Sequence, residues 1–246
     1  MKTALVIASL TATTLVLASP ATAGVRPYVR GAFGGNQLQV DNVNDNIADD
    51  EQALRDGSGY PVELERVGNA FGPELSAGVW LASWVRVGAT YVSQKASALN
   101  DLGINHETTG YHYFDDLRLR TEELGGEVVL RVERLGGLSV GGQAASGRAR
   151  FSESFSESDF SSEYHLRGTA ERTHVTWAAF VGLDQTNEQG IAGFVRCGYR
   201  FRNYGPMPAR VTESDASTSI SYDTTTIPLD YSGFFLSLGV GYDFRW

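Results

Sequence analysis

The last fourteen residues, 233–246, constrain the fold of this chain more than any other stretch. They read GFFLSLGVGYDFRW, in which every second residue is apolar or aromatic and those between are mostly small or charged. Side chains alternate across a β-strand, so the segment predicts a strand with one apolar face. A soluble sheet rarely leaves such a strand unpaired, because an apolar edge promotes aggregation. A transmembrane β-barrel requires it, with the apolar face toward lipid.

Seven further segments share this alternation and are predicted as strands: 25–35, 71–83, 85–94, 121–133, 138–151, 172–183 and 190–203. The strand at 138–151 needs a bulge near Ser146, because Phe151 falls on the wrong parity for an outward residue. The connections alternate in length. Long polar loops are expected at 37–69, 96–120, 152–171 and 204–231, and short turns at 83–84, 134–137 and 184–189. This two-sided rule is typical of outer-membrane barrels, which have short periplasmic turns and long extracellular loops.

The sequence thus predicts an all-β protein with one domain over residues 24–246. The expected architecture is an eight-stranded antiparallel up-and-down transmembrane β-barrel with short periplasmic turns and long extracellular loops. A soluble sandwich would show no such rule for its connections. A soluble barrel would carry its polar residues outside and its apolar residues inside. Here the aromatic face of the strands is expected to lie outside, so the opposite face, which carries Arg and Glu, is expected to lie inside.

The N-terminus and the overall charge narrow the class further. Residues 1–23 are predicted to be a secretory signal peptide, with Lys2, an apolar run over 4–18, and a small-x-small cleavage site at 21–23. The sequence after residue 23 contains no run of eighteen apolar residues, so no membrane-spanning helix is predicted there. One cysteine, Cys197, excludes an internal disulfide. The net charge of −9 argues against nucleic acid as a partner.

The signal peptide, the opening strand at 28–35 (YVRGAFGG), the alternating loops and the ending GVGYDFRW carry a family resemblance. The chain resembles the small eight-stranded outer-membrane proteins of the OmpA transmembrane-domain and OmpX/Ail type. The resemblance implies a monomer in the outer membrane of a Gram-negative bacterium, in contact with the bilayer and with lipopolysaccharide. It also implies that the insertion machinery reads Tyr242, Phe244 and Trp246 as a C-terminal signal.

Charged side chains on the polar faces are expected to meet inside the barrel. Eight strands enclose an interior just wide enough for side chains. The predicted lumen network comprises Arg30, Glu74, Arg86, Glu123, Glu127, Arg131, Arg196, Arg200, Asp243 and Arg245. Opposite charges occur at each level, as the desolvation of buried charges demands. A structural plug of ion pairs and a narrow gated ion path both remain open.

No catalytic, cofactor or metal residue is predicted. His106, His112 and His165 fall in expected loops, and His174 is expected to face the lumen. A metal site would need clustered ligands; the one combination considered, His112 with Asp115 and Asp116, is expected to be a solvated loop instead. Lipid A deacylase barrels resemble the chain in size but carry a His-x-Ser-Asn motif. Here the residues Val-Thr-Trp follow His174.

The loops are the remaining place for a function, because rigid scaffolds commonly present function there. Tyr111, Phe114, Tyr164 and Tyr222 stand among acidic and hydroxyl residues, a composition suited to protein or glycan surfaces. A solvated coat that packs with lipopolysaccharide is the other reading. We therefore predict a structural or surface-interaction role, in adhesion or envelope integrity, through the extracellular loops. A narrow solute or ion channel is the first alternative, and a lipid A-modifying enzyme is the second.

Overall fold

The computed structural model describes residues 25–59, 61–106, 109–132, 135–158 and 162–244. The elements in this part of the chain are β1 (Arg26–Gln37), α2 (Asp41–Ser58), β2 (Asn69–Ala82), β3 (Val85–His106), β4 (Thr109–Val132), β5 (Leu138–Ser158), β6 (Glu163–Thr186), β7 (Ile191–Phe201), β8 (Asn203–Asp215), β9 (Ser219–Asp230) and β10 (Gly233–Asp243). The predicted signal peptide lies outside the described residues, as do Arg245 and Trp246.

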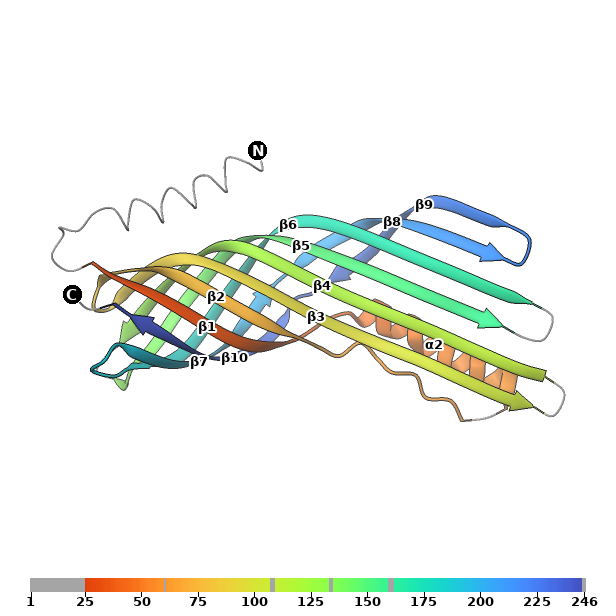
Figure 1. Cartoon of the computed structure of the whole chain (residues 1–246), viewed down its shortest axis with the longest axis horizontal. Helices are drawn as coiled ribbons and strands as arrows, with labels where there is room; N and C mark the ends of the chain where they lie inside the picture. The colour runs from red at the N-terminus through yellow and green to blue at the C-terminus, as the bar shows by residue number, and fades with distance from the viewer. Residues whose placement is uncertain (1–24, 60, 107–108, 133–134, 159–161, 245–246) are drawn as a thin grey trace.

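Eight of these strands form a closed antiparallel ring. Its order is β1–β2–β3–β4–β5–β6–β7–β10, and β10 returns to pair with β1. Strand β10 lies between β1, where Val29 faces Tyr242, and β7, where Ile191 faces Tyr242. The predicted fold class, including the closing role of the C-terminal strand, is confirmed. Figure 1 shows the ring at one end of an elongated molecule.

The three short connections lie at the end of the barrel where β1 begins and β10 ends (Figure 1). The connection from β2 to β3 leaves two residues between Ala82 and Val85. Gly136, Gly137 and Gly190 have positive φ angles in the other two. At Gly190 a side chain would also collide with the carbonyl oxygen of Asp243, so both backbone and space require glycine there.

Three of the predicted long loops are strands instead. The β3–β4 pairing runs without a shift from Val85↔Leu130 to His106↔Thr109, and β5–β6 runs from Leu138↔Leu183 to Ser158↔Glu163. The segment predicted as a loop at 204–231 contains the hairpin β8–β9, and β8 pairs with the distal part of β6. The loop assignments at 96–120, 152–171 and 204–231 were therefore wrong. These hairpins project beyond the ring (Figure 1).

The polarity of the two strand faces reverses where the hairpins leave the ring, and this hid them from the sequence pattern. On β4, Glu123 and Glu127 face inward, and so do Leu117 and Leu119 on the same parity. The outward register changes in the opposite sense, from exposed Leu124 and Val128 to polar Arg118 and Arg120. The physical reason is that water replaces lipid outside the projecting part. The apolar side chains there must therefore turn inward.

The same reversal removes the bulge predicted near Ser146. Strand β5 pairs with β4 and with β6 in continuous register through this region. Phe151 is buried and lies opposite Leu119 and Ala170 inside the projecting part. Its parity is that of an inward residue, so no bulge is needed.

The predicted loop at 37–69 contains helix α2, which lies against the projecting hairpins (Figure 1). Val43 and Ile47, four residues apart on one helix face, are buried in the apolar core there. The helix ends at Gly59, whose φ is 71° and whose N–H donates to the carbonyl of Arg55 at 2.9 Å. The large apolar residues of this acidic segment, Val43, Ile47 and Leu54, are too few to give a helical pattern in the sequence. Within the described ranges, no helix is long and apolar enough to cross a membrane.

The apolar core of the projecting part joins α2, the segments before and after it, and seven strands. It comprises Leu38, Val40, Val43, Ile47, Val62, Leu64, Val67, Ala70, Ala96, Ala98, Tyr113, Leu117, Leu119, Ala149, Phe151, Ala170, Tyr204, Met207, Ala209, Leu229 and Tyr231. We call this part, with α2 and the projecting hairpins, the extracellular unit. It is built as a water-soluble domain is, with apolar residues inside.

Candidate functional site

Glu127 is the centre of the charged lumen. The carboxylate accepts a hydrogen bond from the hydroxyl of Tyr28 at 2.9 Å and forms an ion pair with Arg196 at 3.1 Å. The Nε atom of Arg86 lies 3.7 Å from it. The side chains of all four residues are buried, so neighbouring protein groups replace the water that each charge loses on burial.

Nearer the short turns, two carboxylates bind the arginines of β1 and β3. Arg30 lies 2.6 Å from Asp243, and Arg86 lies 2.5 Å from Asp184. Asp243 also accepts hydrogen bonds from the indole of Trp80 at 3.2 Å and from the hydroxyl of Thr186 at 2.9 Å. The carboxylate of Asp243 is thus fixed from three strands.

Toward the extracellular unit, two more pairs cross the lumen. Arg200 donates to Glu74. Arg202 binds both oxygens of Glu123, at 2.8 and 2.7 Å, and reaches Gln94 at 2.7 Å. The planar guanidinium suits such two-point contact, which explains why arginine rather than lysine occupies these positions.

The structure brings eight of the ten predicted lumen residues into ion pairs: Arg30, Glu74, Arg86, Glu123, Glu127, Arg196, Arg200 and Asp243. Arg131 is half-buried, lies 5.9 Å from the ring centre of Trp80, and forms no ion pair among the described residues. Arg245 lies outside those residues.

Two members of the network were missed. The predicted turn at 184–189 includes Asp184, but β6 continues to Thr186 and carries Asp184 inward. Arg202 shares the inward parity of Arg196 and Arg200 on the predicted strand 190–203, but the predicted network omits it. Extending the alternation of β6 beyond residue 183 would have found Asp184.

Aromatic rings line the lumen beside the arginines. The guanidinium of Arg196 lies 4.9 Å from the ring centre of Phe180 and 4.6 Å from that of Phe194. Arg200 lies 4.2 Å from the ring centre of Phe235. Each ring presents its negative face to a cation and fills space that water would otherwise occupy. Arginine side chains are therefore held by packing as well as by charge.

The lumen has little free space between these groups. In the cavity between Arg30, Glu74 and Arg196, the volume open to the centre of a water molecule is about 10 Å³. That volume holds no more than about one water.

The histidines do not form a catalytic or metal cluster in the described part of the chain. His112 pairs with Asp101 at 2.8 Å, whereas Asp115 faces inward and Asp116 binds Arg118. The three side chains considered as metal ligands are therefore separated, and the described residues contain no group of three or more such ligands. His174 is predicted to face the lumen, but its side chain is exposed, so this prediction is wrong. Residues 171–176 of β6 lie between the stretches that pair with β8 and β7, which leaves this side chain uncovered.

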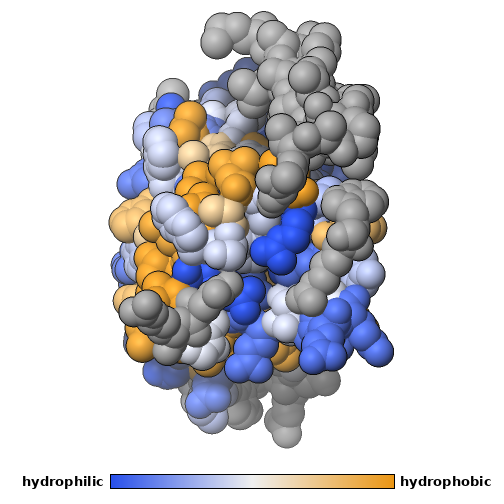
Figure 2. Space-filling view, turned by 90° about the vertical axis from the view of Figure 1, so that its left-hand side faces the viewer, coloured by the Kyte–Doolittle hydropathy of each residue, from blue (hydrophilic) through white to orange (hydrophobic). Residues whose placement is uncertain are grey.

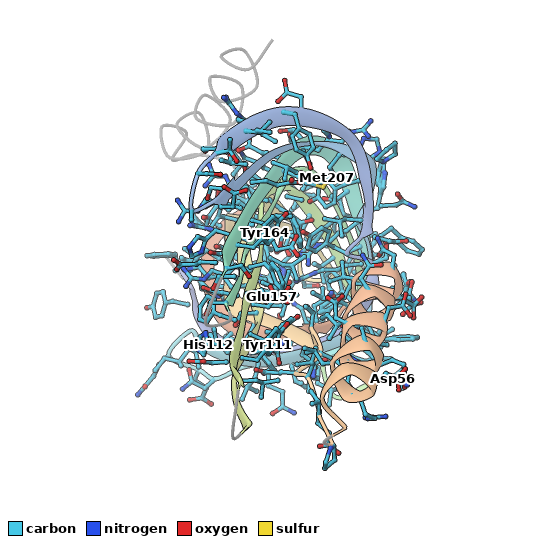
Figure 3. The ribbon with its side chains drawn as sticks, turned by 90° about the vertical axis from the view of Figure 1, so that its right-hand side faces the viewer. Asp56, Tyr111, His112, Glu157, Tyr164 and Met207 are labelled. Atoms are coloured by element: carbon cyan, nitrogen blue, oxygen red, sulfur yellow. The ribbon has the colours of Figure 1, made fainter. Side chains whose placement is uncertain are left out.

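An acidic cluster lies inside the extracellular unit. Asp115 on β4 is buried, and Glu153 on β5 and Asp50 on α2 are close enough to repel it. Figure 3, from the hairpin end, shows α2 at one side of the barrel outline and Tyr111, Glu157 and Tyr164 across β4, β5 and β6. Burial, together with repulsion from Glu153, Asp50 and Asp116, raises the pKa of Asp115 to about 7.

We expect the extracellular unit to lose stability as the pH rises from about 4 to 7. The folded state holds a proton on Asp115 that the unfolded chain has already released, so each increase in pH favours unfolding until Asp115 ionises near pH 7. Asp115→Asn should weaken this dependence, leaving the smaller part that comes from Glu153 and Asp50, and should increase the protection of the α2 amides at pH 8. Hydrogen exchange, corrected for its intrinsic pH dependence, measures the effect. Asp56→Asn on the exposed helix face is the control, and parallel pH profiles for parent and Asp115→Asn would contradict the assignment.

The outside of the ring is apolar, the reverse of its inside. Large apolar side chains exposed there include Phe33, Leu75, Tyr91, Leu124, Val128, Leu130, Val140, Val175, Trp177, Val181, Ile191, Phe234, Leu236, Leu238, Val240 and Tyr242. Figure 2, from the short-turn end, shows hydrophobic residues along one side of the rim and hydrophilic residues near the middle. A closed strand ring with such an exterior satisfies its backbone hydrogen bonds in lipid. The fold and its two faces define a transmembrane β-barrel of the outer-membrane type.

The sequence matches no protein-family model and none of the curated proteins. Among solved structures, the chain is similar to a major outer membrane protein from Thermus thermophilus, with 12% identity and a TM-score of 0.46. It is also similar to Neisserial surface protein A, with 13% identity and a TM-score of 0.44. A third similar structure is that of the attachment invasion locus protein Ail of Yersinia pestis in complex with the heparin analogue sucrose octasulfate, with 11% identity and a TM-score of 0.43. Each match covers 90% of this chain and 100% of the other.

Proposed function

We propose that this protein is a closed outer-membrane barrel that holds a folded extracellular unit for contact with a partner outside the cell. The observation that carries the proposal is the apolar core in which α2 packs against the projecting hairpins. Such a core fixes the hairpins relative to one another, and a rigid scaffold presents a binding surface at low entropic cost. An unstructured polar coat would need no core.

The hairpin β8–β9 offers the contact surface. Ile220 is 60% exposed and Tyr222 is 41% exposed. Tyr222 donates to Glu213, and Tyr164 on β6 interacts with the same carboxylate. Asp215 holds the turn of this hairpin, because it accepts hydrogen bonds from the backbone N–H groups of Ser217 and Thr218 at 2.7 and 2.8 Å. Exposed tyrosines on a fixed hairpin give contact area with little loss of side-chain freedom on binding.

The test displays the chain on a non-adherent bacterial strain and measures retention on host cells and on extracellular matrix. We expect the parent to confer retention and the double variant Ile220→Asp/Tyr222→Ser to lower it several-fold. Gln189→Ala, in a turn at the opposite end of the barrel, is the matched control, and all three must reach the surface in equal amounts. A parent that confers no retention on any surface would remove contact as the function and leave envelope integrity.

Ion pairs across the lumen and the apolar core beyond them both favour a closed barrel over a channel. In planar bilayers we expect the parent to produce no discrete conductance steps, because opening a path would separate buried charges from their partners. Conductance steps from the parent would instead support the narrow channel.

Mass spectrometry of lipid A from cells with and without the protein checks the enzymatic alternative, and we expect identical spectra.

A further inference from the structure

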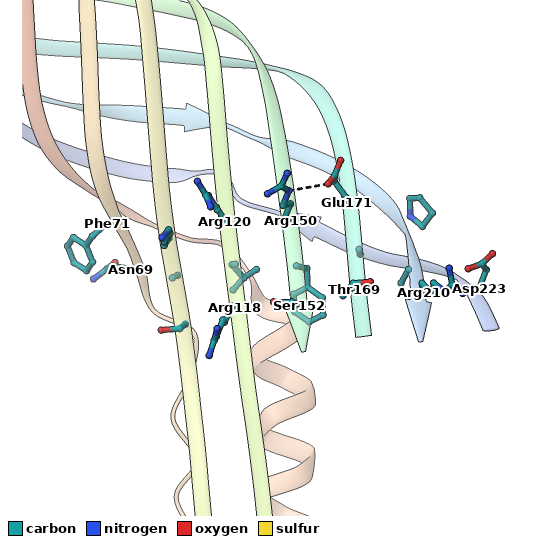
Figure 4. Close-up of a pocket in the computed structure, with 18 residues that line it drawn as sticks. Asn69, Phe71, Arg118, Arg120, Arg150, Ser152, Thr169, Glu171, Arg210 and Asp223 are labelled. Carbon is teal, nitrogen blue, oxygen red and sulfur yellow. Dashed lines mark hydrogen bonds and ion pairs between the residues drawn. The ribbon is translucent and has the colours of Figure 1, made fainter. Parts of the chain in front are cut away.

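A groove of about 1060 Å³ lies where the projecting strands leave the ring, and its lining includes outward-facing side chains (Figure 4). Its basic members are Lys95 on β3, Arg118 and Arg120 on β4, Arg150 on β5 and Arg210 on β8. The groove thus collects cations from four strands at one height of the barrel.

Three of these cations lie directly opposite one another. The strand registers pair Lys95 with Arg120, and Arg120 with Arg150. Like charges at paired positions on neighbouring strands destabilise a sheet. A row of three is therefore expected only where anions lie among them.

The chain supplies part of that negative charge. Glu171 binds Arg150 at 3.1 Å, and Glu122 binds Arg120 at 2.6 Å. The cations at the two sides of the groove, Lys95 and Arg210, are not held in ion pairs with any of the described residues. Asp223 faces Arg210 across β8–β9 and lines the same groove, but the two side chains form no ion pair, and the guanidinium of Arg210 instead donates to the hydroxyl of Ser221 at 3.3 Å.

The height of the groove matches the polar layer of a membrane. Leu124, the first exposed apolar residue below it on β4, is four residues from Arg120, which is about 13 Å along a strand. With strands tilted by about 40°, the cations lie about 10 Å above Leu124, at the outer margin of the polar headgroup layer, which is about 5–8 Å thick. Phe71, opposite Lys95 and 52% exposed, brings an apolar surface into the same groove.

We propose that this groove binds the phosphate groups of a phosphorylated glycolipid in the surrounding outer leaflet, with the acyl chains on the apolar exterior below. Guanidinium groups match phosphate oxygens two at a time, and a basic pocket at headgroup depth selects lipid phosphate over a soluble anion. Lys95 and Arg210 supply the charge that the chain leaves unpaired. The inference rests on the proposed function only for the direction of the hairpins, outward from the cell.

The test measures binding of bisphosphorylated lipid A to the folded protein in detergent micelles, where orientation in a membrane has no effect. We expect lipid A to bind, lipid A stripped of its phosphates not to bind, and inorganic phosphate not to compete. The double variant Lys95→Gln/Arg210→Gln should bind about 10- to 30-fold more weakly, as expected for two surface cations. Neither side chain has an internal ion pair to lose, so the variant should fold.

Two controls separate a lost site from a damaged protein. Arg167→Gln removes an exposed arginine of β6 outside the groove, and it should leave binding unchanged. Lys95→Arg should retain binding. Equal affinity of the double variant and the parent, or equal binding of dephosphorylated lipid A, would overturn the site. Competition by inorganic phosphate would overturn its assignment to a lipid. None of these outcomes depends on the cell-retention result, so the two proposals fail separately.

Discussion

Glu127→Gln is expected to destabilise the barrel by about 3–5 kcal/mol. Arg196 forms its only ion pair among the described residues with Glu127, so the variant leaves a buried guanidinium without a paired carboxylate. The variant also removes the Glu127 carboxylate from Arg86 and from the hydroxyl of Tyr28. Urea unfolding of the protein folded in lipid vesicles, followed by tryptophan fluorescence, measures the change in the free energy of unfolding.

Glu122→Gln provides the matched control. Glu122 lies five residues away on the same strand, faces outward and pairs with Arg120 at 2.6 Å in a partly exposed position. Its loss should cost no more than about 1 kcal/mol, as for other surface ion pairs. The double variant Glu127→Gln/Arg196→Met should recover part of the lost stability, because it removes the unpaired charge. Similar losses for Glu127→Gln and Glu122→Gln would show that the lumen pair carries no special cost.

The second large effect is expected for a charge introduced on the apolar outer surface of the ring, and it tests which part of that surface faces lipid. Leu238→Arg on β10, where the leucine is 70% exposed, should cost about 2–4 kcal/mol or prevent insertion, because the charge enters the hydrocarbon layer. Val128→Arg on β4 should behave in the same way. The measurement is the yield of folded protein in vesicles and its urea midpoint.

Leu99→Arg is the control for this prediction. Leu99 is 54% exposed and also faces outward, but it lies in the extracellular unit opposite Asp116. An arginine there meets water and a carboxylate, and it should change stability by less than about 0.5 kcal/mol. If Leu238→Arg and Leu99→Arg insert and unfold alike, the apolar exterior of the ring is not the lipid-facing surface.

The parity of the strands could be read from the sequence because it depends on nothing beyond neighbouring residues. Side chains of a strand alternate in every context, so the sequence alone predicts Leu238 and Val240 outward and Arg196 and Arg200 inward, as the structure has them. The closing role of the C-terminal strand followed from the same rule. An aromatic face needs lipid, and a strand in lipid needs a partner at each edge.

Which charge meets which was decided only by the tertiary structure. Glu127 and Arg196 are 69 residues apart, and their contact follows from the tilt and stagger of a closed ring. The sequence pattern also treated one strand face as having one polarity along its whole length. On β4 that polarity reverses between Leu119 and Glu123, because the surroundings of the strand change from water to lipid.

The sequence by itself determined the strand alternation, the class of barrel and the charged nature of its lumen, since each depends on local periodicity and composition. Helix α2, the projecting hairpins and the groove around Lys95 and Arg120 were decided only in three dimensions. The burial of Val43 and Ile47 depends on Leu117 and Phe151 from strands distant in the chain. Hydrophobic stabilisation arises from the apolar area that such segments remove from water together, so it cannot be read from the sequence of any one segment.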